Sequence, residues 1–254
     1  MSPTLELYES LDKAFAHFNE HLFDGKLPPC LITLRSSNKI YGYHHSARFI
    51  NLQGQTVDEL GLHPGHFTLR SLEAVLSTLV HEMVHHWQHH FGTPSRTNPH
   101  NAEWVKKMRD IGLSPSNTGL PGGKTTGHRV SHYIEPAGRF MTACKALTDA
   151  GFELRWFDRQ LPAEPEHEAT LQTRLADAGL AMPVSPRPIQ VLSELQAAEG
   201  ASLEKPPIPP SARPPAKKRL KFSCGGCGTR VWATSDIAMM CIPCGRALDS
   251  EEII

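Results

Sequence analysis

The sequence His81-Glu82-Met83-Val84-His85 has the residue types and the spacing of a zinc-binding peptidase motif. Two histidines four residues apart project from the same face of a helix, so both imidazoles can bind one zinc ion. The glutamate between them is placed to accept a proton from a zinc-bound water, and zinc lowers the pKa of that water to about 7. We therefore predict that His81 and His85 are zinc ligands and that Glu82 is the catalytic base.

A catalytic zinc ion also needs a third protein ligand and one open position for water. Two side chains that follow the motif could supply this ligand, His100 and Glu103. Imidazole and carboxylate groups both bind zinc, so the residue types leave the two alternatives open.

The motif lies within a segment that predicts a long helix from about Ser71 to Phe91. Four apolar side chains form one stripe along it, and the motif histidines fall roughly opposite that stripe. These apolar residues are Leu72, Leu76, Leu79 and Met83. A core face and a ligand face are therefore distinct, as a helix beneath an active-site cleft requires.

Three further histidines, His86, His89 and His90, follow the motif directly. The pairs His85/His89 and His86/His90 also have four-residue spacing, but neither pair encloses a glutamate. We therefore place these three histidines around the zinc ligands or on the surface. The alternative is that the whole histidine-rich face is simply solvated.

The rest of the first 158 residues predicts an α+β fold, a small zincin-like domain with a short sheet. The expected elements are a helix in the first 25 residues, strands at 31–35, 39–45 and 47–52, and helices at 102–111 and from Pro136. Residues 112–127 are expected to be irregular. The segment 47–52 is either an edge strand that pairs with extended substrate or an ordinary core strand.

A polar segment further along, TGHRVSHYIEP, contains His128, His132 and Tyr133. These side chains could polarise the scissile carbonyl or stabilise its oxyanion, and Tyr133 is the candidate for that role. The alternative is a strand with one polar face.

Six cysteines divide into two groups. Cys30 and Cys144 are predicted to be buried free thiols. The other four have C-x2-C-x13-C-x2-C spacing with a glycine after each pair, which predicts a zinc ribbon; they are Cys224, Cys227, Cys241 and Cys244. Four thiolates leave no open position on the metal, so this zinc is expected to be structural.

Basic and aromatic residues beside and within the ribbon could bind DNA, with single strands favoured, because aromatic rings stack on unpaired bases. They are Lys217, Lys218, Arg219, Lys221, Arg230 and Trp232. The alternatives are a solvated linker end with Trp232 packed in the ribbon core, or a ribbon that docks proteins.

The net charge of the chain limits how it could bind nucleic acid. The chain has 254 residues with 26 basic and 26 acidic side chains, and this zero net charge argues against electrostatic coating of nucleic acid by the whole protein.

The distribution of prolines indicates the domain organisation. Eleven of 21 prolines lie between Leu161 and Pro215. We predict a catalytic domain at 4–158, a proline-rich linker that is partly helical or disordered at 159–219, and the ribbon at 220–248. No membrane span or secretory signal is visible, so a cytoplasmic location is expected.

The motif followed about fifteen residues later by His100-x-x-Glu103-Trp104 resembles the SprT-like zinc metalloprotease family. The segment AFAHFNEHLFDGKLP at 14–28 also looks like the opening helix of that family, and the resemblance extends to about Phe157. It implies that His100 is the third ligand and that Glu103 lies near it, orienting an imidazole. Asn101 is a departure, since the family often has glycine there.

The resemblance also implies a function: a zinc-dependent endopeptidase in which Glu82 activates a zinc-bound water, acting on DNA-associated or DNA-crosslinked proteins. One catalytic and one structural Zn²⁺ would be the cofactors. The rival hypothesis is a non-proteolytic zinc-binding adaptor for nucleic acid or transcription. Glu82 favours the enzyme, because a purely structural metal site needs no base.

Overall fold

The structure is a computed structural model that describes residues 2–35, 40–158, 166–181, 184–199, 219–234 and 237–251. The chain divides into two units, Met1–Lys205 and Pro206–Ile254, which are considered separately. Lys217 and Lys218, two of the predicted DNA-binding residues, lie outside the described residues.

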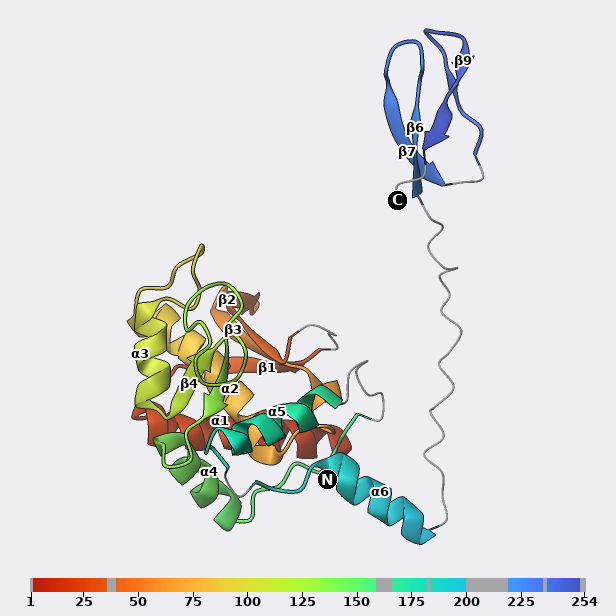
Figure 1. Cartoon of the computed structure of the whole chain (residues 1–254). Coiled ribbons are helices and arrows are strands. Elements are labelled where there is room, and N and C mark those ends of the chain that lie inside the picture. The colour runs from red at the N-terminus through yellow and green to blue at the C-terminus, as the bar shows by residue number, and fades with distance from the viewer. Residues whose placement is uncertain are drawn as a thin grey trace. The chain divides into compact units, whose positions relative to one another are not determined.

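The first unit is built from helices packed around a three-stranded sheet, with a second, two-stranded sheet beside them (Figure 1). In chain order its elements are α1 (Pro3–Phe23), β1 (Cys30–Leu34), β2 (Gly42–Ile50), β3 (Thr56–Leu62), the 3-10 turn η1 (Pro64–His66), α2 (Leu72–Phe91), α3 (Ala102–Asp110), β4 (Leu113–Ser116), β5 (Ser131–Ile134), α4 (Arg139–Asp149), α5 (Glu166–Asp177) and α6 (Pro188–Glu199). The mixture of helices with small sheets agrees with the predicted α+β class.

Helix α2 carries the motif and lies between the sheet and the helices α1 and α4 (Figure 1). It begins after Ser71, whose hydroxyl accepts a hydrogen bond from the backbone N–H of Ala74, and it ends at Gly92. Glu73 in the first turn and histidines in the last turn suit the helix dipole. The predicted limits of this helix are confirmed.

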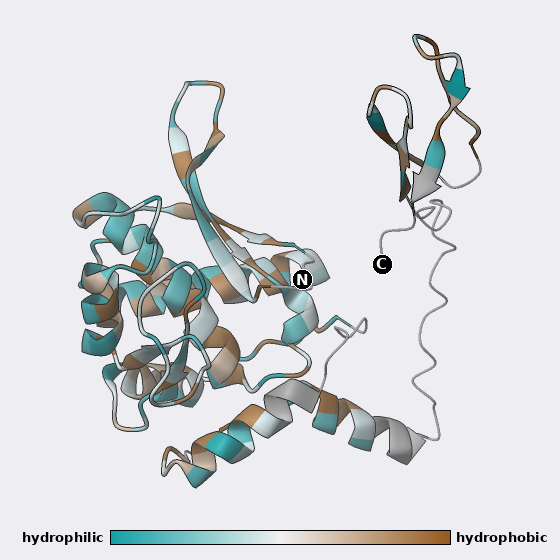
Figure 2. Ribbon diagram, turned by 45° about the horizontal axis from the view of Figure 1, so that its top comes forward, coloured by the Kyte–Doolittle hydropathy of each residue, from teal (hydrophilic) through white to brown (hydrophobic). Residues whose placement is uncertain are grey.

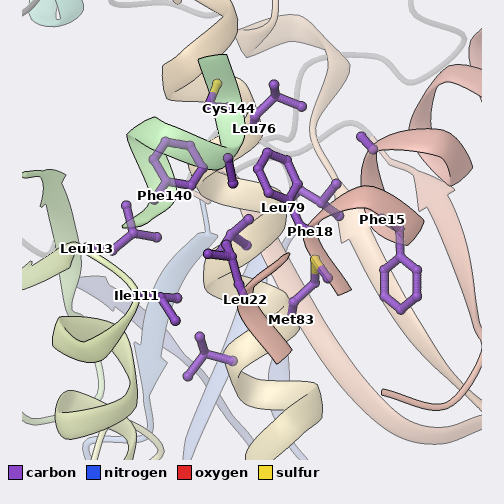
Figure 3. Packing of buried hydrophobic residues seen from close by; sticks show 14 of the residues in the cluster. Phe15, Phe18, Leu22, Leu76, Leu79, Met83, Ile111, Leu113, Phe140 and Cys144 are labelled. Carbon is purple, nitrogen blue, oxygen red and sulfur yellow. The ribbon is translucent and has the colours of Figure 1, made fainter. Parts of the chain in front are cut away.

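The apolar side of α2 packs into the main core of the first unit (Figure 3). Leu76, Leu79 and Met83 are almost completely buried there. Phe18 of α1 and Phe140 of α4 stack on each other beside them, with ring centroids 5.5 Å apart. This packing fixes the rotation of α2 about its axis, and thereby the direction in which the motif histidines point.

Strand β3 is the centre of the three-stranded sheet, whose order is β1-β3-β2. It runs parallel to β1 and antiparallel to β2. Its sequence, TVDELGL, does not predict a strand, because it carries two acids and lacks the alternation of a half-buried strand. Its acidic residues are nevertheless buried, and both have partners described below.

The two strands predicted at 39–45 and 47–52 are one strand, β2, with a bulge between His45 and Phe49. Ala47 within the bulge has a φ of +48°, an uncommon conformation for a residue with a Cβ. Beyond it the β2–β3 hairpin extends away from the helices (Figure 2). The segment 47–52 therefore belongs to the bulge and the outer hairpin.

The segment 112–127 is not wholly irregular, since β4 pairs antiparallel with β5. Cys144 is buried and Cys30 is half-buried, both as free thiols, and burial raises the pKa of each to about 12. Among the described residues, no helix is both long enough and apolar enough to span a membrane.

Part of the predicted linker packs on the first unit. Helices α5 and α6 both lie within the range 159–219, which the sequence predicts to be partly helical or disordered. The N–H and hydroxyl of Ser185 both donate to the carboxylate of Glu73, and the N–H of Ile189 donates to the carbonyl of Thr68. The predicted domain limits otherwise stay a prediction.

The second unit contains short strands only, among its described residues. They are β6 (Arg219–Ser223), β7 (Arg230–Thr234), β8 (Met240–Cys241), β9 (Arg246–Ala247) and β10 (Asp249–Glu251). Strand β6 pairs with both β7 and β10, and β8 pairs with β9.

Candidate functional site

A cleft of about 1180 Å³ opens over helix α2. Its lining comes from α2, from residues 40–46 at the start of β2, from the loop that ends at His100, and from residues 128–132. Elements far apart in the sequence therefore meet around the motif, and all of them contribute polar groups.

The three predicted zinc ligands come together in this cleft. His81, His85 and His100 each offer a ring nitrogen, and these nitrogens all lie within 4.8 Å of one another. Burial lowers the pKa of all three imidazoles, so they are neutral at neutral pH with a lone pair to donate. Three neutral imidazoles beside an open cleft fit a catalytic zinc ion.

His100 is held in the orientation that a ligand needs. Its Nδ1–H donates to the carbonyl of Gly127 at 2.8 Å, which leaves Nε2 as the nitrogen with the free lone pair. Gly127 also pairs with His100 through the backbone as an isolated β-bridge. The segment before β5 thus fixes both the backbone and the ring of this histidine.

His81 is oriented by His132 through a chain of hydrogen bonds. The hydroxyl of Ser77 donates to the carbonyl of Ala74, so it accepts from Nε2–H of His132, 2.9 Å away. The Nδ1 of neutral His132 is then an acceptor, and it receives Nδ1–H of His81 at 3.0 Å. Burial, and secondarily Arg70, lowers the pKa of His132 to about 3, which keeps it neutral. The Nε2 of His81 remains free to bind a metal.

Trp104 of α3 lies against all three imidazoles. Its ring centroid is 4.8 Å from that of His81, 5.1 Å from that of His85 and 4.5 Å from that of His100. The indole is fully buried, so its volume restricts how the rings can turn. The aromatic residue four positions after His100 therefore has a physical role beside the ligands.

Glu82 is buried beside the ligands and lines the cleft. Burial raises the pKa of its carboxyl group to about 8. No described residue donates a hydrogen bond to this carboxylate, so Glu82 has no structural partner that would explain its burial. A carboxyl group with a raised pKa holds a proton well, as expected of a general base that must also return it.

The backbone of Gly42 packs directly on the Glu82 side chain. A Cβ at this position would lie 2.9 Å from Oε1 of Glu82 and 3.0 Å from Cγ2 of Thr78. Glycine at the start of β2 therefore lets the strand approach the base closely.

The part of β2 that lines the cleft is not the segment 47–52, which the sequence allows as a substrate-binding edge strand. Strand β2 is an edge strand, but residues 40–46 line the cleft, whereas Phe49 and Ile50 lie beyond the bulge. The bulge interrupts the regular pairing between His45 and Phe49. Of the two alternatives for 47–52, the edge strand agrees with the order of the sheet, since residues 47–50 belong to β2, but the segment lies outside the cleft lining.

Two predicted positions are also corrected. The Glu103 carboxylate accepts from the side chain of Gln88 and from the N–H of Thr93, so it fastens the loop after α2 and orients no imidazole. Tyr133 is not among the cleft-lining residues, because neighbouring side chains on a strand point to opposite faces and His132 points to α2.

The four cysteines of the second unit converge on one point. Their sulfurs lie within 4.8 Å of one another, and those of Cys227 and Cys241 are 3.6 Å apart. A disulfide needs about 2.05 Å, whereas two thiolates on a tetrahedral zinc ion are about 3.8 Å apart. The geometry fits a structural zinc site.

Both cysteine pairs are held by the same turn. The N–H of Gly228 donates to the carbonyl of Cys224, and the N–H of Gly245 donates to that of Cys241. Gly228 and Gly245 have φ values of +71° and +61°, which explains why glycine follows each pair.

One face of the β6–β7 hairpin carries predicted DNA-binding residues. Lys221 pairs directly with Trp232, and Arg230 lies two residues before Trp232, on the same face. Trp232 is 59% exposed, whereas Phe222 is buried, so Phe222 and not Trp232 fills the ribbon core. Arg219 belongs to the same strand as Lys221.

Comparisons with known proteins match parts of the chain to one family and one relative. The SprT-like family model matches residues 11–125. A Salmonella typhimurium protein described as "Uncharacterized protein in mucB 3'region" is 49% identical over 59 residues, which cover 23% of this chain and 80% of that protein. No solved structure matches the chain significantly.

Replacing His132 with phenylalanine tests how His81 is oriented. The ring is retained, but His81 loses the acceptor for its Nδ1–H. We expect zinc affinity at the cleft site to fall about 10- to 100-fold, as for the loss of other groups that orient a ligand. Competition with a zinc chelator measures the affinity.

The control is His21→Phe, which changes the same residue type on α1, outside the cleft. It should leave zinc affinity unchanged. Equal affinities for wild type and His132→Phe would show that His81 needs no such acceptor.

Proposed function

The chain belongs to the SprT-like family, and on that premise we propose that it is a zinc-dependent endopeptidase acting on proteins bound or crosslinked to DNA. The observation that carries the proposal is the convergence of His81, His85 and His100 in a cleft beside Glu82. A solely structural zinc site would need neither the open cleft nor a buried base.

The residues of the cleft divide the work of hydrolysis. Zinc held by the three imidazoles would supply a Lewis acid that polarises the peptide carbonyl and makes water more acidic. Glu82 would take the proton from the attacking water and deliver it to the nitrogen of the leaving amine. Burial favours the protonated carboxyl group, and a bound cation favours the carboxylate, so the two effects oppose each other at this residue.

The free edge of β2 is suited to hold the substrate. Residues 40–46 line the cleft, and among the described residues β2 pairs with β3 on one side only. An extended peptide that pairs with this edge would be held by its backbone, so few side chains would be excluded. Such tolerance suits a peptidase that meets varied proteins at one location.

The ribbon supports the DNA part of the proposal. Lys221, Arg230 and the exposed Trp232 share one face of the β6–β7 hairpin. Cations there would contact phosphates, and the indole would stack on an unpaired base, which favours single strands. A ribbon that docks proteins is the alternative, and DNA-binding measurements separate the two.

Replacing Glu82 with glutamine should abolish cleavage while zinc is retained. Glutamine keeps the size of the side chain but cannot take a proton, and general-base catalysis typically contributes roughly 100- to 10,000-fold. Cleavage of an unfolded protein in the presence of single-stranded DNA gives the rate, and elemental analysis gives the zinc content.

Glu9→Gln is the matched control, since Glu9 is an exposed carboxylate on α1. Its rate should equal that of wild type. Equal rates for wild type and Glu82→Gln would contradict the catalytic role and favour a non-proteolytic adaptor.

Replacing Gly42 with alanine should slow cleavage without unfolding the protein. The new Cβ would displace the end of the flexible Glu82 side chain and press on Cγ2 of Thr78, which costs some stability but leaves the fold intact. A misplacement of about 1 Å can cost about 100-fold in rate. Rate, zinc content and thermal unfolding are measured together. Loss of zinc, or a large fall in the unfolding temperature, would show that the packing of Gly42 on Glu82 is not the cause.

Replacing Trp232 with alanine should weaken binding to single-stranded DNA. Stacking of one base on an aromatic ring is worth about 1–3 kcal/mol, so the affinity should fall roughly tenfold or more. Fluorescence anisotropy with a labelled oligonucleotide measures it. Trp156→Ala, at a half-exposed indole of the first unit, is the control. Unchanged affinity in Trp232→Ala would favour the protein-docking alternative.

A further inference from the structure

A second cluster of metal-binding groups lies where β2, β3 and α2 meet. His44 of β2, Asp58 of β3 and His86 of α2 each offer a ligand atom, and these atoms lie within 4.8 Å of one another. None of these side chains belongs to the imidazole triad of the cleft. We propose that these three residues bind a second divalent metal ion of the zinc type in the first unit.

The atoms of this cluster converge on one carboxylate oxygen. Oδ2 of Asp58 is 2.8 Å from Nε2 of His44 and 2.8 Å from Nδ1 of His86. Two ligands on a tetrahedral zinc ion with bonds of about 2.0–2.1 Å are about 3.3 Å apart, so a small outward shift would admit the ion. Two imidazoles and one carboxylate are also a donor set that zinc uses in enzymes.

The hydrogen-bond partners of His86 are those of a metal ligand. Its Nε2 lies 3.0 Å from the carbonyl of Pro28, which can only accept a hydrogen bond, so Nε2 is the ring nitrogen that donates. Its Nδ1 is the nitrogen that faces the Asp58 carboxylate, 2.8 Å away. A metal-binding imidazole is commonly held in this way, with its other ring N–H on a backbone carbonyl.

Burial makes the arrangement costly without a cation. His86 is 0% exposed and Asp58 is 4% exposed, while the His44 side chain is only slightly accessible. A carboxylate taken out of water is stable only with charged or hydrogen-bonded partners. A metal ion would satisfy the carboxylate and both imidazoles at once.

The surroundings hold Asp58 as a ligand is usually held. Its other oxygen, Oδ1, accepts the N–H of Ala47 at 2.8 Å, inside the β2 bulge. Hydrogen bonds of this kind fix the direction of a ligating carboxylate. His90 also approaches Oδ2, with its Nε2 at 3.1 Å, and is the nearest group for a fourth position.

A metal ion at this point would tie the substrate strand to the active-site helix. His44 lies in the part of β2 that lines the cleft, and His86 directly follows the ligand His85 on α2. The ion would therefore set the distance between the free edge of β2 and the catalytic residues. This role is structural, and it does not depend on peptidase activity.

Metal counting on the full chain tests the inference. Protein saturated with Zn²⁺ and dialysed against metal-free buffer should retain about three zinc ions per chain, one each for the triad, the ribbon and this cluster. Asp58→Asn keeps the size of the side chain but removes the charge, and it should retain about two. His81→Ala should also retain about two, since it removes only the triad site.

His45→Gln is the matched control, because His45 neighbours His44 but points to the other face of β2. It should retain about three ions. If Asp58→Asn fails to fold, His44→Gln takes its place at the less buried end of the cluster.

A wild-type count of about two overturns the inference, whatever the variants show, and leaves the contacts of His44 and His86 with Asp58 as hydrogen bonds without a metal ion. A count of about three that persists in both Asp58→Asn and His44→Gln overturns it as well, since the third ion is then elsewhere. Neither result affects the proposed peptidase, whose ion is lost in His81→Ala.

Discussion

Helix α2 must satisfy two demands at once: one side is buried in the apolar core, and the other carries histidines and a glutamate that are also withdrawn from water. Burial makes the imidazoles neutral, and neutrality makes them metal ligands. A buried imidazole must still place its remaining N–H on an acceptor. Much of the surrounding structure consists of the groups that provide these acceptors.

Those acceptors come from segments without regular structure or at element ends. The carbonyl of Gly127 accepts a hydrogen bond from the ring of His100. The ring of His132 accepts one from His81 and donates one to the hydroxyl of Ser77. Each hydrogen bond fixes the position of the ring and also determines which of its two nitrogens carries the hydrogen. The cleft is therefore preorganised by the tautomers of its histidines, and these depend on β5 and the segment before it lying close to α2.

The sequence was sufficient to predict α2, His81, His85 and the cysteine site, because each rests on short-range spacing within a helix or a turn. His100 lies fifteen residues beyond His85, and only the family resemblance favoured it over Glu103. The sequence was not sufficient for contacts between distant residues. The choice of His132 over Tyr133 depends on which face of β5 meets α2, and Glu103 bonds to a loop whose path is set by α3. Strand β3 was not predicted, because it carries two buried acids and lacks the alternation of a half-buried strand.

The two acids of β3 show why burial cannot be read from polarity. Side chains alternate along a strand, so Asp58 faces α2 while Glu59 faces the opposite side. There Glu59 accepts hydrogen bonds from Thr33 and Tyr43 and pairs with Arg35. Asp58 thus contacts His44 and Ala47 of β2, and Glu59 contacts Tyr43 of the same strand, so both acids hold β2 in place. These two adjacent residues of β3 therefore set the position of β2, and with it the edge of the cleft, relative to α2. Strand β2 cannot shift without separating one of the two carboxylates from its partners.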